Sequence, residues 1–294
     1  MKLLLFGGSG MLGAKLATEA ARKRFTVRAF SHEMTPIDDR RAVRLAFEAV
    51  RPDVVVNAAG VIPPTFGRGR DRAGTVGDLN VAMVMTNALG PQVLAQAARL
   101  FSVPLIHVST DCVFSGDGDR VKAVDCPPDA RDVYGRSKLV GEDIVEPNDR
   151  LVTVVRTSFV GFEHGLLAWF VSRALAGHGV EGYRHAWWSG SRASVVARQL
   201  LDRVRRRSPV LDRFCVDPPG GIQHLATASP ISKDHLLRTL KELFGFSVAI
   251  TPVEHPYVGR GLVPTTDPKD DPYELPPFEA AAIELAKEWK ESDR

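Results

Sequence analysis

Short apolar runs alternate with helix-like segments along the first half of the chain. Residues 3–6, 26–30, 54–56, 105–108 and 152–155 are short and mostly apolar, which is typical of buried parallel strands. Between them, residues 11–23, 40–50, 80–101 and 133–144 carry apolar side chains at helical spacing. This alternation predicts an α/β fold, a Rossmann-type doubly wound parallel sheet.

The pattern changes after about residue 157. Helices are expected over residues 166–176 and 193–206, the latter ending in the basic run 205–207, and near residues 279–290. Another helix is expected to open at Ser229 and Pro230, because serine as N-cap and proline at the first helical position are a start signal. We therefore expect a Rossmann domain over residues 1–160. Residues 161–294 should add the last sheet elements and a smaller C-terminal substrate-binding lobe.

Composition narrows the class of protein. Of 294 residues, 44% are hydrophobic and 25% are charged, as in ordinary soluble globular proteins. The net charge is only +3 and the basic residues are scattered, so nucleic acid is not an expected partner. Cys112, Cys126 and Cys215 lack metal-ligand spacing, so neither a metal site nor a disulfide framework is expected. No apolar run reaches the roughly 20 residues of a membrane helix, so we expect no membrane association and a cytoplasmic location.

A glycine-rich loop leads directly from the first strand into the first helix. Gly7, Gly10 and Gly13 fit the spacing GxxGxxG, in which they permit a tight turn, close approach of a pyrophosphate, and close helix packing. The helix N-terminus at Met11 and Leu12 then favours negative charge. An ordinary strand-helix turn is the alternative. The flanking strand and helix favour a dinucleotide site, which makes the first domain NAD(P)-binding.

The end of the second strand bears on which nicotinamide cofactor binds. Sites that prefer NAD normally place Asp or Glu there, about 20 residues after the glycine loop, on the ribose hydroxyls. Ser31 and His32 occupy this place, with Arg28 nearby, so a 2′-phosphate would meet less repulsion. Glu33 could still reach the ribose. The sequence therefore favours NADP(H) over NAD(H) and leaves the second open.

Three polar residues are candidates for catalysis. Tyr134 and Lys138 stand four residues apart on a predicted helix, which puts phenol and ammonium on one face. Thr110 ends the preceding strand, so all three can meet at the carboxyl edge of the sheet. Ketone reduction needs a proton donor, and we expect Lys138 to lower the pKa of Tyr134 from about 10. The structural alternatives are simple packing for Tyr134 and a helix N-cap for Thr110.

Further segments make the chain resemble the extended short-chain dehydrogenase/reductase superfamily, and within it the dTDP-4-dehydrorhamnose reductase group of nucleotide-sugar reductases. The similar segments lie before about residue 160 and follow the order of the family. They are residues 7–13, 51–60, 87–91, 109–116, 134–142 and 156–158.

The resemblance implies roles for particular residues. Thr110, Tyr134 and Lys138 would be the catalytic set, and Lys138 would also bind the cofactor. The other implied cofactor residues are Asn57, Ala58, Ala59, Gly60 and Ser158. The implied substrate residues are Asp111, Cys112, Phe159 and Trp188. Family members commonly have Tyr in place of Cys112 and Trp in place of Phe159, so the sugar pocket is expected to differ.

The implied function is NAD(P)H-dependent reduction of a nucleoside-diphosphate-linked 4-keto-6-deoxy sugar, in sugar-nucleotide or polysaccharide biosynthesis. One alternative is a nucleotide-sugar epimerase or dehydratase, although dehydratases usually carry an acidic pair beside the threonine and here only Asp111 is acidic. Another is a non-catalytic NADP-binding subunit, like the regulatory subunit of methionine adenosyltransferase, which resembles the same group. The loop over residues 61–79, which contains three arginines, is either a lid or a solvated loop. The sequence does not decide whether the chain forms a homodimer.

Overall fold

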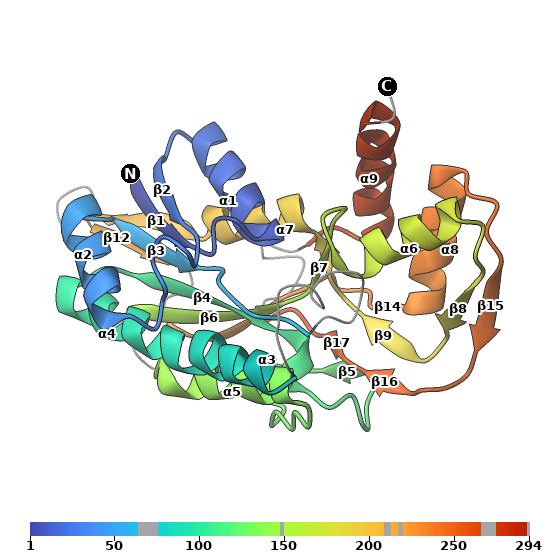
Figure 1. The fold of residues 1–294 in the computed structure, drawn as a ribbon, viewed down its shortest axis with the longest axis horizontal. Coiled ribbons are helices and arrows are strands. Elements are labelled where there is room, and N and C mark those ends of the chain that lie inside the picture. Colours follow the sequence, from blue (N-terminus) through green and yellow to red (C-terminus); the bar gives the residue numbers. More distant parts are fainter. Residues whose placement is uncertain (64–75, 148–149, 209–212, 217–219, 266–274, 293–294) are drawn as a thin grey trace.

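The computed structural model describes residues 1–63, 76–147, 150–208, 213–216, 220–265 and 275–292. Its centre is a six-stranded parallel sheet (Figure 1). The strands lie in the order β13 (Gly221–Leu225), β6 (Val152–Thr157), β4 (Leu105–Thr110), β3 (Val54–Asn57), β1 (Lys2–Phe6) and β2 (Thr26–Phe30). All five strands expected from the apolar runs are present. The predicted Rossmann-type α/β fold is confirmed.

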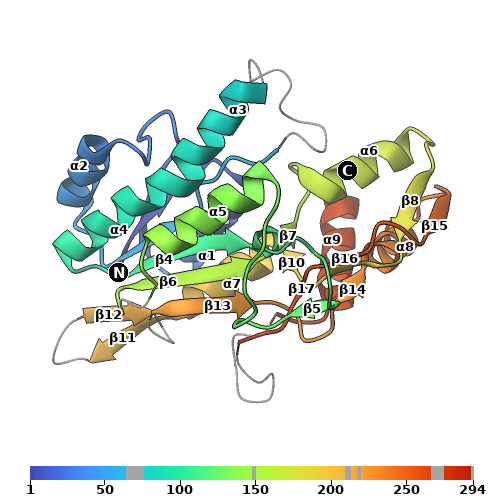
Figure 2. The ribbon, with the colours of Figure 1, turned by 90° about the horizontal axis from the view of Figure 1, so that it is seen from below.

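Helices cover both faces of this sheet. Helices α1 (Met11–Arg22) and α7 (Ala193–Asp202) pack on one face, and α2 (Arg40–Val50) and α4 (Gly90–Phe101) on the other. Helix α5 (Val133–Ile144) lies beside α4 (Figure 2). Strand β1 shows why its residues are uniformly apolar: Leu3 and Leu5 enter the first core, whereas Leu4 and Phe6 enter the second. A strand buried on both faces needs no polar alternation.

The order of the strands reverses between β1 and β3. The chain passes from β1 outward to β2, then returns to β3 on the other side of β1 and continues to β4. Loops that follow the two strands therefore diverge at their carboxyl ends and leave a crevice, which is where open α/β sheets bind ligands. The glycine loop after β1 and residues 58–60 after β3 meet at this crevice.

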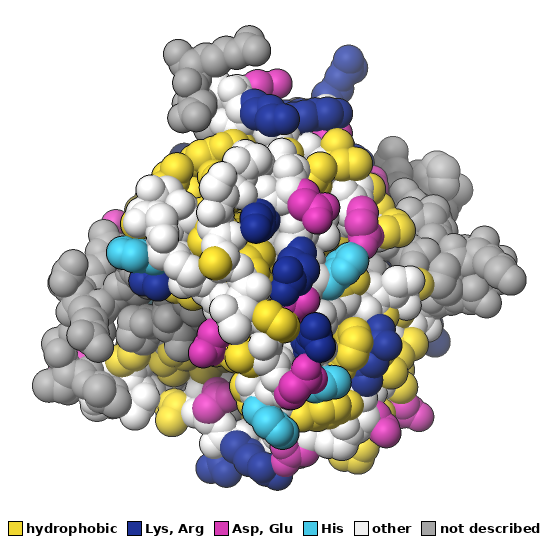
Figure 3. All heavy atoms as spheres, turned by 90° about the vertical axis from the view of Figure 1, so that its right-hand side faces the viewer, with side chains coloured by type: hydrophobic (Ala, Val, Ile, Leu, Met, Phe, Trp, Pro, Cys, Tyr) yellow, Lys and Arg dark blue, Asp and Glu magenta, His cyan; other side chains and the backbone are white. Residues whose placement is uncertain are grey.

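A smaller lobe lies beside the carboxyl edge of the sheet (Figure 1). It contains helices α6 (Gly165–Leu175), α8 (Lys233–Phe244) and α9 (Phe278–Ser292). Its strands are β8 (Val180–Tyr183) with β15 (Ile250–Val253), and β14 (Ile231–Ser232) with β9 (Ala186–Trp188) and β16 (Val258–Gly259). A separate apolar core holds the lobe together. On its outer face, basic and acidic side chains are interspersed (Figure 3).

Three short strand pairs complete the described structure. Strand β7 (Phe159–Val160) pairs with β10 (Ser191–Arg192), and β5 (Val121–Lys122) pairs with β17 (Gly261–Leu262). Strand β11 (Val204–Ser208) pairs with β12 (Arg213–Val216) in an antiparallel hairpin. The first two pairs connect the lobe to segments that follow the central strands. They hold it against the site edge.

Three sequence expectations need correction. The helix expected over residues 193–206 ends at Asp202, because Val204 turns into the hairpin and the basic run 205–207 lies in β11. Ser229 and Pro230 do not open a helix. Residues 231–232 first pair with β9, and the Ser232 side chain then caps α8 by accepting from the His235 amide. The helix expected over residues 80–101 begins earlier, as α3 (Val76–Met83), and passes through a π-helical turn, Val84–Leu89, before α4.

Within the described ranges, no helix combines the length and apolarity that crossing a membrane would need. The same ranges contain no group of three or more side chains suited to hold a metal ion. The three arginines of the predicted 61–79 loop lie outside the described residues.

Candidate active site

The glycine loop has the tight geometry that its spacing predicts. Gly7 has a φ of +81°, and a Cβ there would overlap the backbone of Ala58 and Ala59. A Cβ on Gly13 would overlap the Gly7 carbonyl, so only glycine lets α1 start this close to β1. Gly10 differs, because a Cβ at this position would meet only the Gly7 oxygen, at 3.3 Å. A Cβ on Gly10 would therefore be tight against this one backbone oxygen and clear of all other atoms at the start of α1.

Two adjoining cavities open from this loop. The larger has a volume of about 770 Å³. It lies between the glycine loop, Ser31 and His32 on one side and helix α3 with its following π-helical turn on the other. The smaller, of about 160 Å³, reaches Tyr134, Lys138, Phe159 and Met11. Gly10, Ala58, Ala59, Gly60 and Ile62 line both. One elongated ligand could therefore run from the end of β2, across the helix N-terminus, to Tyr134.

Asp38 is a site residue that the sequence patterns did not indicate. It lines the larger cavity, and its Oδ1 atom is buried without a hydrogen-bond partner among the described residues. A buried carboxylate oxygen without a partner, on a residue that lines a cavity, is suited to accept from a ligand N–H or O–H group. Glu33, which we considered for the ribose, is exposed and does not line this cavity. Asp38 follows the second strand too distantly for the usual spacing rule to find it.

Tyr134 and Thr110 come together at the carboxyl edge. Tyr134 lies in the first turn of α5, whose N-cap Asp132 accepts from the Gly135 amide at 2.8 Å. Thr110 ends β4, and its hydroxyl accepts from the Cys112 amide at 3.2 Å, so it is also the N-cap of a short 3-10 turn, Asp111–Val113. Burial raises the pKa of Tyr134, whereas the nearby Thr110 hydroxyl, which donates to Asp111 Oδ1 at 3.1 Å, acts to lower it. A phenol protonated at neutral pH thus lies beside a hydroxyl.

Lys138 does not have the environment that we expected. Its ammonium is buried and donates to the carbonyl of Val108, two residues before Thr110 in β4, at 2.7 Å. Burial lowers the pKa of Lys138 to about 8, and Glu142 opposes this shift. The prediction that the pKa of Tyr134 is lowered is wrong. Desolvation raises this pKa by more than the contact that favours the phenolate lowers it.

The low pKa of Lys138 predicts a pH-dependent stability. Its ordinary pKa is 10.5 and its folded pKa is about 8, so between these values the unfolded chain binds more protons than the folded chain. The contribution of Lys138 to the free energy of unfolding should therefore rise from about pH 8 to about pH 10.5. Urea unfolding of the native chain and of Lys138→Met across this range measures the difference. A pH-independent difference would contradict the assignment.

A cluster of buried charged and polar side chains contacts the strand and helix that carry the candidate catalytic residues. Arg156 binds Glu142 through two nitrogens, with Nη2 to Oε2 at 2.7 Å and Nε to Oε2 at 3.0 Å, and both side chains are almost completely buried. Ser109, next to Thr110, donates to the same carboxylate. Asn87 joins the Val61 carbonyl to the Ser137 hydroxyl. In the sequence, Asn87, Glu142 and Arg156 stood out only as points of resemblance, without a role.

The predicted substrate residues occupy unequal positions. Phe159 lines the smaller cavity. Asp111 and Cys112 follow Thr110 directly, and Cys112 Sγ contacts an Asp111 oxygen at 3.5 Å. Burial raises the pKa of the Cys112 thiol to about 12, which leaves it a poor nucleophile. Trp188 packs on Phe278 in the lobe core and lines neither cavity; its indole N–H donates to the Ser158 hydroxyl at 2.7 Å.

A third cavity lies in the lobe. Its volume is about 550 Å³, and its walls come from α6, β8, α8 and β15. Trp169 and Leu237 give it an apolar side, while Arg173 and Lys233 supply positive charge and Glu181 supplies one negative charge. Helix α6 starts directly after His164, a lining residue of the smaller cavity, so it leads from the catalytic edge to the third cavity.

Comparison with known proteins places these features in a family. The sequence profile of the RmlD substrate binding domain matches residues 1–204. The spore coat polysaccharide biosynthesis protein SpsK of Bacillus subtilis is 31% identical over 165 residues, 56% of this chain and 54% of that protein. The dTDP-4-dehydrorhamnose reductase of Mycolicibacterium smegmatis is 37% identical over 161 residues, 54% of this chain and 46% of that protein. The chain thus spans about half the length of the curated relatives it matches.

The fold extends the likeness beyond the matched sequence. The crystal structure of a dTDP-4-dehydrorhamnose reductase from Clostridium acetobutylicum superposes with a TM-score of 0.80 and covers 99% of this chain and 100% of that one. Their sequences are only 20% identical. The lobe, where the sequence resemblance is weak, therefore shares the architecture of that protein.

Proposed function

The chain belongs to the RmlD substrate binding domain family, and from this premise we propose that it is an NADPH-dependent reductase of a nucleoside-diphosphate-linked 4-keto-6-deoxy sugar. One observation carries the proposal. Tyr134, with the Thr110 hydroxyl beside it, lies on a cavity that adjoins the one formed by the glycine loop. A proton donor is thus placed at the far end of a dinucleotide-sized groove.

The residues present fit a nicotinamide dinucleotide. The glycines leave room for a pyrophosphate at the N-terminus of α1, which has no side-chain cap of its own. Asp38 offers an unpartnered carboxylate oxygen to the adenosine half. Ala58, Ala59 and Gly60 line both cavities, so they would lie along the whole cofactor. At the inner end, Lys138 and Phe159 border the space left for the nicotinamide and the carbonyl.

Each catalytic side chain has a separate task. When bound, the reduced cofactor supplies the hydride that the ketone carbon needs. Tyr134 donates its phenolic proton to the carbonyl oxygen as negative charge develops there. The Thr110 hydroxyl, which lies beside the phenol, would stabilise the phenolate that remains. The Lys138 ammonium, fixed by the Val108 carbonyl, adds positive charge to this dry region.

The third cavity suits the nucleotide half of the substrate. Trp169 offers an aromatic face to a base, and Arg173 and Lys233 offer cations to a diphosphate. A sugar linked to that diphosphate would extend along the N-terminal turn of α6 towards Tyr134. This arrangement supports a nucleotide-linked sugar over a small free ketone.

The preference for NADPH rests on the end of β2. Ser31 and His32 line the larger cavity there, and Glu33 does not. A 2′-phosphate would therefore meet no carboxylate from the residues that follow β2 directly. The Asp38 carboxylate would accept a hydrogen bond from the adenosine instead. We expect NADPH to bind more tightly than NADH, and Ser31→Asp to reverse the order by repelling the phosphate. Fluorescence titration of both cofactors checks this; tighter NADH binding by the native chain would contradict it.

A turnover assay tests the proposed reaction. The purified chain, given NADPH and a dTDP-linked 4-keto-6-deoxy sugar, should oxidise one NADPH for each carbonyl reduced to a hydroxyl, as followed by absorbance and by mass spectrometry of the sugar. Rearrangement of the sugar without net NADPH oxidation would instead indicate an epimerase. Tight NADPH binding with no reaction on any keto sugar would indicate a non-catalytic subunit, and either result overturns the proposal.

A further inference from the structure

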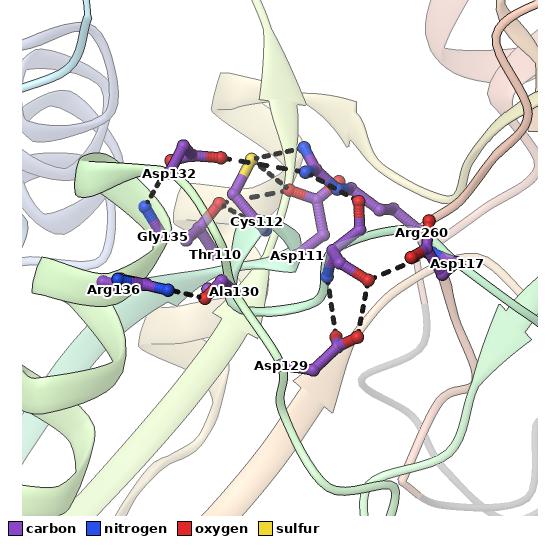
Figure 4. A network of polar contacts seen from close by, with 11 residues as sticks. Thr110, Asp111, Cys112, Asp117, Asp129, Ala130, Asp132, Gly135, Arg136 and Arg260 are labelled. Carbon is purple, nitrogen blue, oxygen red and sulfur yellow. Dashed lines mark hydrogen bonds and ion pairs between the residues drawn. The ribbon is translucent and has the colours of Figure 1, made fainter.

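Arg260 contacts both segments that carry candidate catalytic residues (Figure 4). It follows β16 and lies beyond residues 1–204, the part matched by the family profile. Its Nη2 donates to the Ser115 carbonyl at 3.0 Å, and its Nη1 donates to Cys112 Sγ at 3.5 Å. The same guanidinium lies 3.9 Å from the Asp132 carboxylate. The Arg260 side chain is 24% exposed, so its hydrogen bonds to Ser115 and Cys112 act in partly desolvated surroundings, whereas Asp132 is 55% exposed and its attraction to Arg260 is screened by water.

The first of the two segments is the loop that follows Thr110. The Cys112 amide donates to the Thr110 hydroxyl, so the position of Cys112 bears on that of Thr110. The loop is also held one residue beyond Ser115, where the Gly259 amide donates to the Gly116 carbonyl at 2.6 Å. Residues 258–260 therefore hold residues 112–116 along their length, and Arg260 makes the contacts nearest to the catalytic threonine.

The second segment is the first turn of α5. One oxygen of Asp132 caps this turn by accepting from the Gly135 amide at 2.8 Å, and the other faces Arg260. Gly135 lies directly against the Cys112 carbonyl, where a Cβ would overlap it. Tyr134 is therefore on a turn that packs against the loop held by Arg260. The Arg260 guanidinium thus contacts a carbonyl and a thiol on the loop side of this contact and faces a carboxylate on the helix side.

We propose that Arg260 is a positioning residue that fixes the Tyr134 hydroxyl relative to Thr110. This inference rests on the proposed function for its effect on turnover. A planar guanidinium can bind partners on two sides at once, which the single ammonium of lysine does poorly. Loss of this bridge would let the loop and the α5 turn move apart. Displacements of about 1 Å in a catalytic site can slow a reaction by about 100-fold.

A double-mutant cycle tests whether Arg260 acts through Tyr134. We expect Arg260→Met to slow keto-sugar reduction by about 10- to 100-fold in the native chain and Arg260→Lys to restore it only in part. In a Tyr134→Phe background, Arg260→Met should cause little further loss, because there is no hydroxyl left to position. NADPH affinity should not change, since Arg260 lines neither cofactor cavity. Equal losses in both backgrounds would overturn the proposal.

Hydrogen exchange measured by mass spectrometry gives a readout that needs no substrate. In Arg260→Met, amides in residues 110–116 and 132–138 should exchange faster, while those of α1 should not change. Arg120→Met is the matched control: Arg120 stacks on Trp187 and donates to the Pro230 carbonyl, without a contact to either catalytic segment. Unchanged exchange in Arg260→Met, or equal acceleration in Arg120→Met, would overturn the inference. These exchange rates do not depend on whether the native chain reduces a keto sugar.

Discussion

Replacing Tyr134 by phenylalanine is expected to slow ketone reduction by about 100- to 10,000-fold, the usual range for loss of a general acid. The change removes one hydroxyl from a ring whose packing in the first turn of α5 is otherwise kept. The fold should therefore remain, because the Asp132 cap does not involve this hydroxyl, and the affinity for NADPH should change little, because the ring that lines the smaller cavity is kept and the glycine loop is untouched. Steady-state turnover, cofactor titration and thermal unfolding together measure the three effects.

Tyr257→Phe is the control for this substitution. Tyr257 is exposed in the lobe, where its ring stacks on His185, and the same loss of a hydroxyl there should leave turnover unchanged. If Tyr134→Phe reduced the keto sugar at the native rate, the proton donor would have to be another group. The proposed role of Thr110 as the partner of the phenol would then fail with it.

The raised pKa of Tyr134 is compatible with reduction. A donor must carry its proton when the carbonyl becomes basic, and desolvation keeps this phenol protonated across the neutral range. Thr110 acts against this shift, so its hydroxyl favours the phenolate that proton transfer leaves behind.

The central sheet and the glycine loop could be predicted because their causes are local. Leu3 to Phe6 are apolar since both faces of β1 are covered, and Gly7 and Gly13 are glycines since any Cβ would overlap nearby backbone. Such requirements appear in the order of residues itself. Spacing on α5 likewise placed Tyr134 and Lys138 on one helix, although it could not reveal that the Lys138 ammonium would bind the Val108 carbonyl.

The lobe and the supporting contacts depend on pairings between distant residues. Residues 231–232 form a strand only because β9 lies beside them, which no local signal at Ser229 and Pro230 could indicate. Asp38 and Arg260 reach the site only through tertiary structure. The contact between Arg260 and Ser115, for example, joins residues that are 145 positions apart in the sequence. Residues of this kind need a three-dimensional structure before any role can be assigned.

Gly10→Val is expected to weaken NADPH binding by about 100-fold or more, about 2.7 kcal/mol, while the protein stays folded. Gly10 is the glycine of the loop whose Cβ would meet only one atom, the Gly7 oxygen at 3.3 Å, and it lines both cofactor cavities. A valine side chain would therefore grow into the space for the pyrophosphate and not into the protein. Isothermal titration with NADPH and thermal unfolding separate the two effects.

A graded series strengthens this test. Gly10→Ala, with a single methyl group, should lose less affinity than Gly10→Val and should unfold at nearly the native temperature. Gly13→Ala should behave in the opposite way, because its methyl group would overlap the Gly7 carbonyl and force α1 away from β1, which destabilises the fold itself. Affinity and stability should thus be lost at different glycines of the same motif. If Gly10→Val bound NADPH with native affinity, the pyrophosphate could not lie against Gly10. The proposed dinucleotide site would then be wrong.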